Sequence, residues 1–144
     1  MAIQIKTLDQ LKTMRRAGLL VGHTLELLRQ SIKVGMRTDA LDAIAAANIK
    51  RGGGTSNFLG YHGYPATICI SINDEIVHGI PGDRIIEDGD IVSIDCGAII
   101  DGWHGDAAFS YGVGTVDSAD QKMMDVCEES MWRGFAAAKV GGRL

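Results

Sequence analysis

The sequence has few cysteines and no long apolar run, and each shortage excludes a class of protein. Its three cysteines, Cys69, Cys96 and Cys127, lie far apart with no Cys-x-x-Cys pair. That pattern argues against a disulfide framework and against a structural zinc site. No apolar run approaches the ~20 residues that cross a bilayer, and the amino terminus lacks the apolar stretch of a secretory signal peptide. We therefore expect a soluble protein of the cytoplasm.

Basic charge is also scarce. The 144 residues contain 14 Lys and Arg against 18 Asp and Glu, a formal net charge of −4. A nucleic-acid-binding domain needs a basic surface to neutralise phosphates, so that class is disfavoured. Apolar residues make up 46% and charged residues 22% of the chain, as in ordinary globular domains. The length suits one domain with its own core.

Hydrophobic periodicity predicts helices towards both ends of the chain and strands between them. Helical spacing covers about residues 8–32, after a capping box at Thr7 and Gln10. A second helix is expected from just after Thr38 to the glycines at 52–54, and a third from near Ser118 to Gly141-Gly142. Strands are expected at 66–72, 75–80, 91–100 and 103–111, with turns at Asn73-Asp74 and Asp101-Gly102. Together these elements indicate an α+β architecture.

A five-residue motif occurs twice with one mismatch. Lys33-Val-Gly-Met-Arg37 and Lys139-Val-Gly-Gly-Arg143 each follow a predicted amphipathic helix. Two interpretations stay open on this pattern. The motif either marks a duplicated fold that is cut near its midpoint, or two similar helix ends in one complete domain.

Two aspartates in the predicted hairpin are the strongest candidates for chemistry. Asp95 lies in the most apolar strand, where a carboxylate costs several kcal/mol unless a cation or hydrogen bonds compensate it. If Asp101 and Gly102 form the turn, residue 97 faces Asp106 and residue 95 faces residue 108. Both carboxylates then share one face, with their Cβ atoms about 7–8 Å apart or somewhat less, and can hold one or two divalent cations. The alternative is two aspartates near a turn, one in local hydrogen bonds and one solvated.

Two histidines and a cysteine are weaker candidates. His78 lies at the end of a predicted strand, where a lone histidine is more often structural than a ligand. His62 lies in a loop, Gly60–Pro65, whose glycines and aromatic residues suit either a pocket wall or an ordinary turn. The cysteines are typical of small core residues, with Cys69 near the possible pocket.

Four ordered segments resemble the type I methionine aminopeptidases. They are Gly60-Tyr-His-Gly-Tyr-Pro65, Ile70-Ser-Ile-Asn-Asp-Glu-Ile-Val-His-Gly-Ile-Pro81, Val92-Ser-Ile-Asp95 and Asp101-Gly-Trp-His-Gly-Asp106. Met14-Arg-Arg-Ala-Gly18 is also similar, so the resemblance covers essentially the whole chain. It implies the pita-bread fold, in which two pseudo-symmetric halves surround a central sheet. It also implies a metal-dependent aminopeptidase that removes the initiator Met from new polypeptides.

The resemblance also implies roles for individual residues. Asp95 and Asp106 match the family's first two metal ligands, and His78 matches a catalytic histidine that contacts substrate near the scissile bond. Positions around the pocket for the Met side chain match Tyr61, His62, Tyr64 and Cys69, and Phe58 lies where bacterial relatives often carry Cys. The implied cofactors are two divalent metal ions, with Co, Mn, Fe, Zn and Ni not distinguished. The implied partners are the N-terminal Met of nascent peptides and the ribosome, and neither DNA nor a membrane.

The sequence departs from the family pattern in one large respect. Family members contribute three further metal ligands, one His and two Glu, from a second half, yet no histidine follows His104 here. We therefore expect one partial catalytic domain over residues 1–144, inactive alone. Residues 1–115 would be the first half and residues 116–144 the opening helix of the second. Two alternatives stay open: a non-catalytic pita-bread module that binds peptides or proteins, and a prolidase-like hydrolase.

Overall fold

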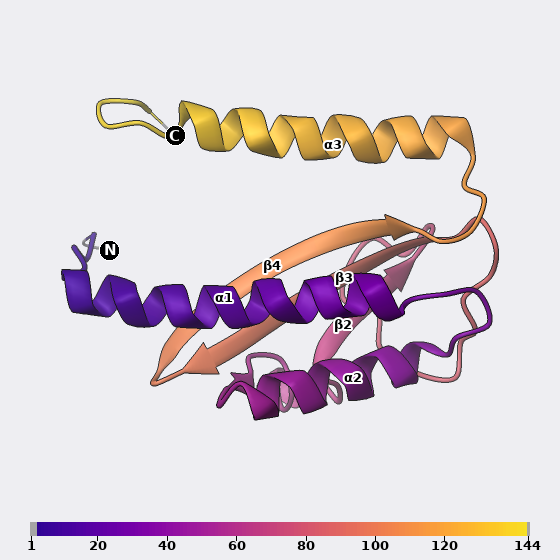
Figure 1. Cartoon of the computed structure of the whole chain (residues 1–144), viewed down its shortest axis with the longest axis horizontal. Coiled ribbons are helices and arrows are strands. Elements are labelled where there is room, and N and C mark those ends of the chain that lie inside the picture. Colours follow the sequence, from indigo (N-terminus) through magenta and orange to yellow (C-terminus); the bar gives the residue numbers. More distant parts are fainter. Residues whose placement is uncertain (1–2, 144) are drawn as a thin grey trace.

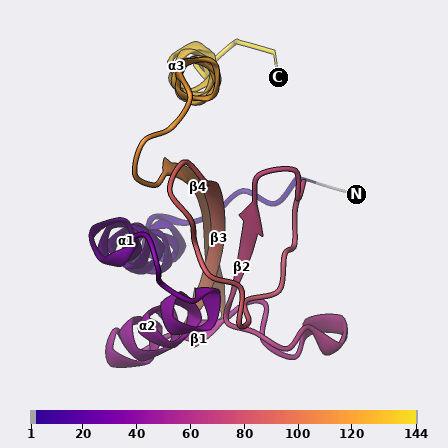
Figure 2. The ribbon, with the colours of Figure 1, turned by 90° about the vertical axis from the view of Figure 1, so that its right-hand side faces the viewer.

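The computed structural model describes residues 3–143 as a sheet with two helices on one face and a third helix beyond one edge (Figure 1, Figure 2). In chain order the elements are α1 (Leu8–Ser31), α2 (Thr38–Arg51), β1 (Thr55–Ser56), the 3-10 turn η1 (Tyr61–Gly63), β2 (Ile68–Ile72), β3 (Ile91–Ile100), β4 (Trp103–Gly112) and α3 (Ser118–Ala137). The predicted α+β class is confirmed.

Helix α1 begins at the predicted capping box, because the Thr7 side chain accepts from the Gln10 backbone and the Gln10 side chain accepts from the Thr7 backbone. Its buried residues, among them Val21 and Leu28, share one core with alternate residues of β3, such as Ile94. The helices α1 and α2 thus cover the face of the sheet to which the even-numbered residues of β3 point (Figure 2).

Strand β3 is central in the sheet. It pairs with β4 along its whole length on one side, and with β1 and β2 on the other. The turn that joins β3 to β4 contains Asp101 at φ +50° and Gly102 at φ +77°, as a two-residue hairpin turn requires. This turn sets Gly97 opposite Asp106 and Asp95 opposite Ala108, which is the predicted register.

The predicted strand at 75–80 is wrong, because the segment forms a loop. Side chains and a single carbonyl take the positions that a neighbouring strand would occupy. The Ile72 N–H donates to Glu75 Oε2 at 2.9 Å, and the Ile70 N–H donates to the Gly79 carbonyl at 2.9 Å. Ile76, which a strand would pack against a core, is 89% exposed.

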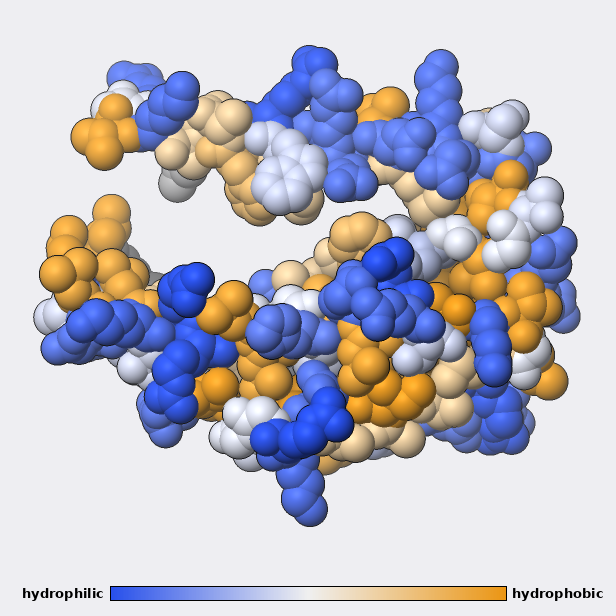
Figure 3. Space-filling model, in the orientation of Figure 1, coloured by the Kyte–Doolittle hydropathy of each residue, from blue (hydrophilic) through white to orange (hydrophobic). Residues whose placement is uncertain are grey.

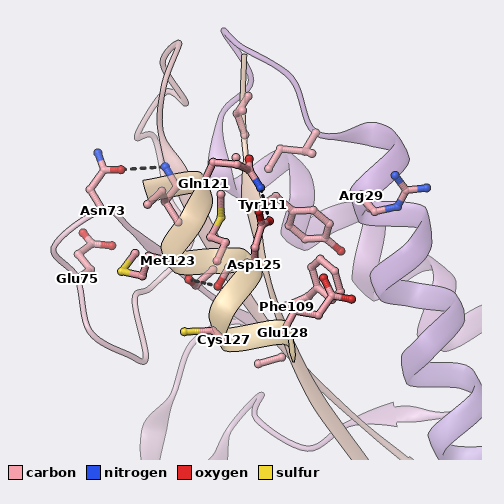
Figure 4. A pocket seen from close by; sticks show the side chains of 18 of the residues that line it. Arg29, Asn73, Glu75, Phe109, Tyr111, Gln121, Met123, Asp125, Cys127 and Glu128 are labelled. Carbon is pink, nitrogen blue, oxygen red and sulfur yellow. Dashed lines mark hydrogen bonds between the residues drawn. The ribbon is translucent and has the colours of Figure 1, made fainter. Parts of the chain in front are cut away.

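Helix α3 buries none of its side chains. A cavity of about 1080 Å³ lies between it and β4, and Figure 3 shows the surface hollowed there. The close-up in Figure 4 places Met123 and Cys127 of α3 on this cavity, with Phe109 and Tyr111 of β4 across from them. The apolar residues that recur with helical spacing along α3 therefore face this cavity and not a packed core.

None of the helices in residues 3–143 combines the length and the apolar character that a membrane-spanning segment requires.

Candidate metal and substrate site

The hairpin brings Asp95 and Asp106 to the face of the sheet that α1 and α2 do not cover. Asp95 alternates with the buried core residues Ile94 and Cys96, so its side chain points away from the helices. Asp106 lies opposite Gly97, two residues from Asp95 on the same face. Asp95 is partly buried and Asp106 is exposed. The predicted shared face of the two carboxylates is thereby confirmed.

The surroundings of Asp95 disfavour a negative charge in the absence of a cation. Burial raises the pKa of the Asp95 carboxyl above its usual value, and the neighbouring Asp106 carboxylate raises it further, while His78 acts in the opposite direction. Asp95 Oδ1 is also buried without a hydrogen-bond partner in residues 3–143. A buried acceptor of this kind is costly unless something positive meets it. Both observations fit a divalent cation held by Asp95 and Asp106.

Two carboxylates are only part of a metal site. Over the described part of the chain, no group of three or more His, Cys, Asp or Glu side chains is close enough to hold a metal ion. Divalent cations bound by carboxylates usually take four or more ligands. The pair therefore needs further ligands before it can form a closed centre.

Strand β2 brings a small apolar wall beside Asp95. Cys69 lies opposite Asp95 in the register of β2 and β3 and is 5% exposed. Burial raises the pKa of its thiol, and Asp95 adds to that effect. Tyr64 lies beside Cys69, and its ring meets that of Phe58 edge to face with centroids 6.5 Å apart. The structure thus brings Phe58, Tyr64 and Cys69 together next to Asp95.

The loop that carries His78 is fixed against β2 by its neighbour Gly79. The Gly79 N–H donates to Ser71 Oγ at 3.1 Å, and the Gly79 carbonyl accepts from the Ile70 N–H at 2.9 Å. A Cβ atom at Gly79 would lie 2.1 Å from the Ile70 carbonyl oxygen, so only glycine fits this approach. His78 itself is exposed, has φ +59°, and lies near enough to lower the pKa of Asp95.

Tyr61 and His62 have a different setting. Both lie on η1, where their rings meet edge to face with centroids 4.3 Å apart. Tyr61 is 68% exposed, and His62 is exposed with φ +47°. These two side chains pack against each other edge to face at the surface. Their contact with a substrate stays a prediction.

No pattern in the sequence singles out Asn57, which lies just after β1. Its side chain covers Gly97, on the same face as the two aspartates. The local sequence carries little signal for this contact, because a strand of two residues has no measurable periodicity. Gly97, inside the predicted strand, was the one sign in the sequence that another group approaches the backbone of this strand closely.

Comparison with known proteins gives one consistent result. Residues 12–144 match the model of metallopeptidase family M24. Over 139 residues the chain is 48% identical to methionine aminopeptidase 1 of Bacillus subtilis (strain 168), covering 96% of this chain and 56% of the relative. It is 47% identical to methionine aminopeptidase 1 of Mycobacterium tuberculosis, covering 96% and 53%.

The solved structures agree with this result. The crystal structure of methionine aminopeptidase from Rickettsia prowazekii superposes with a TM-score of 0.89 at 35% identity, covering 92% of this chain and 54% of that one. The expected pita-bread fold is thus confirmed, and the chain spans about half the length of the relatives it matches. On these matches, the chain belongs to metallopeptidase family M24.

Proposed function

We propose that these residues form the first half of a metal-dependent methionyl aminopeptidase that removes the N-terminal Met from newly made polypeptides. One observation carries the proposal. Asp95 presents a buried carboxylate oxygen without a partner in residues 3–143, on the face that it shares with Asp106 and next to an apolar wall. A cation site beside an apolar wall suits an enzyme that binds an apolar side chain next to the bond it hydrolyses.

Asp95 and Asp106 would hold the divalent ions, of which we propose two. When bound, such ions supply Lewis-acid chemistry and activate water for attack on a peptide carbonyl. The cation charge would act against the burial that raises the pKa of Asp95. His78 is exposed and near enough to Asp95 to lower its pKa, so its imidazole could donate a hydrogen bond to a substrate bound there.

The wall formed by Phe58, Tyr64 and Cys69 would bind the Met side chain. A thioether packs well against aromatic rings, with sulfur about 5 Å from the ring. Tyr64 is held in place because its hydroxyl lies 2.9 Å from the Gly79 carbonyl oxygen and 3.1 Å from that of Ile68. Tyr61 and His62, on the exposed turn η1, would also contact the Met side chain.

A second half would cover the surfaces that residues 3–143 leave open. Strand β4 has no strand on its outer edge within this range, and α3 faces a cavity with Met123 and Met131 exposed. The repeated motif supports a duplicated fold, since Gly35 and Gly141 take nearly the same left-handed φ, +84° and +85°, after their helices. Residues 1–115 would then form the first half, and residues 116–144 would begin the second.

The proposed substrate is the first residue of a new chain, so we expect the protein to work in the cytoplasm, close to the ribosome. Its three free cysteines suit a reducing compartment.

A peptide assay tests the proposal. The full-length protein, extended past Leu144, is given Mn²⁺ or Co²⁺ and a Met-Ala-Ser peptide, and release of Met is measured. Asp106→Asn should abolish release while leaving the far-UV circular dichroism spectrum unchanged. Asp101→Asn is the matched control, since Asp101 lies at the exposed turn, paired with Arg16 at 2.8 Å. A full-length protein that binds metal and leaves the peptide intact would instead be a binding module.

A further inference from the structure

Two buried side-chain atoms have no hydrogen-bond partner in residues 3–143, and both lie at the site described above. One is Asp95 Oδ1 and the other is Asn57 Oδ1. Unpartnered buried polar atoms are rare in native proteins, and each needs an explanation. Two oxygen acceptors that are left open on one face of a sheet suggest a common cause.

The Asn57 side chain crosses the sheet above Gly97. The Asn57 backbone N–H donates to the Gly97 carbonyl at 3.2 Å, which ties the residue to β3 on the side of β1. Its Nδ2 donates to the Gly105 carbonyl of β4 at 3.4 Å. A Cβ atom at Gly97 would lie 2.7 Å from Asn57 Nδ2. The amide therefore occupies the space that a side chain at residue 97 would take.

This position sets the Asn57 amide beside Asp106, because Gly97 and Asp106 are opposite each other on one face. The Gly105 carbonyl fixes the orientation of the Asn57 amide. If Oδ1 took the place of Nδ2, two oxygen acceptors would face each other. Asn57 Oδ1 is thus an acceptor on the same face of the sheet as the Asp95 and Asp106 carboxylates. An amide oxygen only accepts hydrogen bonds, so another acceptor atom on this face cannot satisfy Asn57 Oδ1.

We propose that Asn57 is a positioning residue of the cation site: its amide oxygen accepts a hydrogen bond from the water of a divalent cation held by Asp95 and Asp106. The inference rests on the proposed function. The amide orients the hydrated ion from the β1 side of Gly97, and through Nδ2 it also holds the strand that carries Asp106. Neighbours that orient ions and ligands in this way typically contribute 10–100-fold to metal affinity.

This role predicts opposite effects on stability and on cation affinity. Without a cation, Asn57 Oδ1 is a buried acceptor with no donor among residues 3–143, and its removal offsets the loss of the long 3.4 Å hydrogen bond from Nδ2 to the Gly105 carbonyl. Asn57→Leu should therefore leave the melting temperature unchanged or raise it. The same substitution should weaken Mn²⁺ binding by roughly tenfold or more. Asn57→Asp should do the reverse, because a third carboxylate repels Asp106 in the cation-free protein and attracts the cation when it is present.

The experiment compares Mn²⁺ binding by titration calorimetry with thermal denaturation in chelator, both in the full-length protein. The variants are Asn57→Leu, Asn57→Asp, Asp106→Asn and the control Asn48→Leu. Asn48 is a buried asparagine whose Nδ2 donates to Thr24 Oγ1 at 2.9 Å. Its replacement should lower the melting temperature and leave the Mn²⁺ affinity unchanged.

The outcomes separate this inference from the function on which it rests. Opposite shifts for Asn57→Leu and Asn57→Asp, with Mn²⁺ binding lost in Asp106→Asn, support it. If Asp106→Asn loses Mn²⁺ while both Asn57 variants bind it as tightly as wild type, Asn57 is merely structural and the inference is overturned alone. If the wild-type protein shows no saturable Mn²⁺ binding, both the inference and the proposed metal site are overturned.

Discussion

Replacing Gly105 with alanine tests how closely α1 packs on the sheet that carries the site. Gly105 is buried in β4, directly before Asp106. A Cβ atom there would lie 2.6 Å from the Ala17 carbonyl carbon and from the Gly18 nitrogen of α1. Both atoms belong to the backbone of a helix 24 residues long, so no side chain can rotate to make room. The whole helix must move.

The size of the required movement sets the expected loss of stability. Ordinary contact begins at 3.4 Å, so α1 must retreat from 2.6 Å to at least that distance. A gap of about 0.5–1 Å forfeits a quarter to a half of the dispersion energy of each contact, and α1 buries Val21, Leu25 and Leu28 against the same core. Overpacking typically costs about 1–3 kcal/mol. We expect the upper end of that range, and a fall in Tm of roughly 6–12 °C.

Thermal denaturation followed by far-UV circular dichroism, at one fixed protein concentration, measures this effect. The matched control is Gly18→Ala, the same chemical change on the α1 side of this contact, at a residue whose own Cβ would point into open space. A Cβ atom at Gly18 meets nothing within 4 Å, and alanine is better than glycine inside a helix by about 0.5–1 kcal/mol. Gly18→Ala should therefore raise Tm. If Gly105→Ala melts within about 2 °C of wild type, the close approach does not limit this interface and the reasoning is wrong.

Three further predictions concern the thiols, an ion pair and the chain by itself. Near pH 8 only the exposed Cys127 should react with a thiol reagent, because Cys69 and Cys96 are buried and burial raises the pKa of Cys96 to about 12. Mass spectrometry should find one adduct per folded chain. Rapid labelling of all three thiols would contradict the buried positions. Hydrogen bonds from Arg29 and Gln30 lower the pKa of Glu26 from 4.5 to about 2, so its stabilising effect is present above 4.5 and is lost as the pH falls through 2. The stability difference between wild type and Glu26→Gln in urea denaturation should shrink over that interval, and a difference that grows on acidification would reverse the assigned sign. The 144-residue chain alone should release no Met and should associate through its open β4 edge and the α3 cavity; a monodisperse, active monomer in light scattering would disprove this.

The hairpin was the most predictable part of the molecule, because its signals are local. Asp101-Gly102 requires left-handed backbone at both positions, and the observed φ values of +50° and +77° meet that requirement. Once the turn is set, the period of two along each strand determines every pairing up to Ile91. The shared face of Asp95 and Asp106 followed from this arithmetic alone.

The loop at 75–80 and the role of Asn57 were not predictable, because both depend on contacts between distant segments. Ile76 and Val77 have the composition of a strand, yet the Glu75 side chain accepts the bond that a strand partner would take. Asn57 acts across Gly97, and only the assembled sheet shows that the missing Cβ leaves room for it. Local propensity carries no information on either contact.

The hydrogen bonds along the outer edge of β2 limit how a polypeptide can be recognised. Its outward N–H groups at Ile68, Ile70 and Ile72 are each engaged, by Asp42 Oδ1, by the Gly79 carbonyl and by Glu75 Oε2. An extended peptide therefore cannot add to this edge as a further strand. If the protein has the proposed activity, backbone pairing with this edge would contribute no affinity for the substrate residues that follow the cleaved Met.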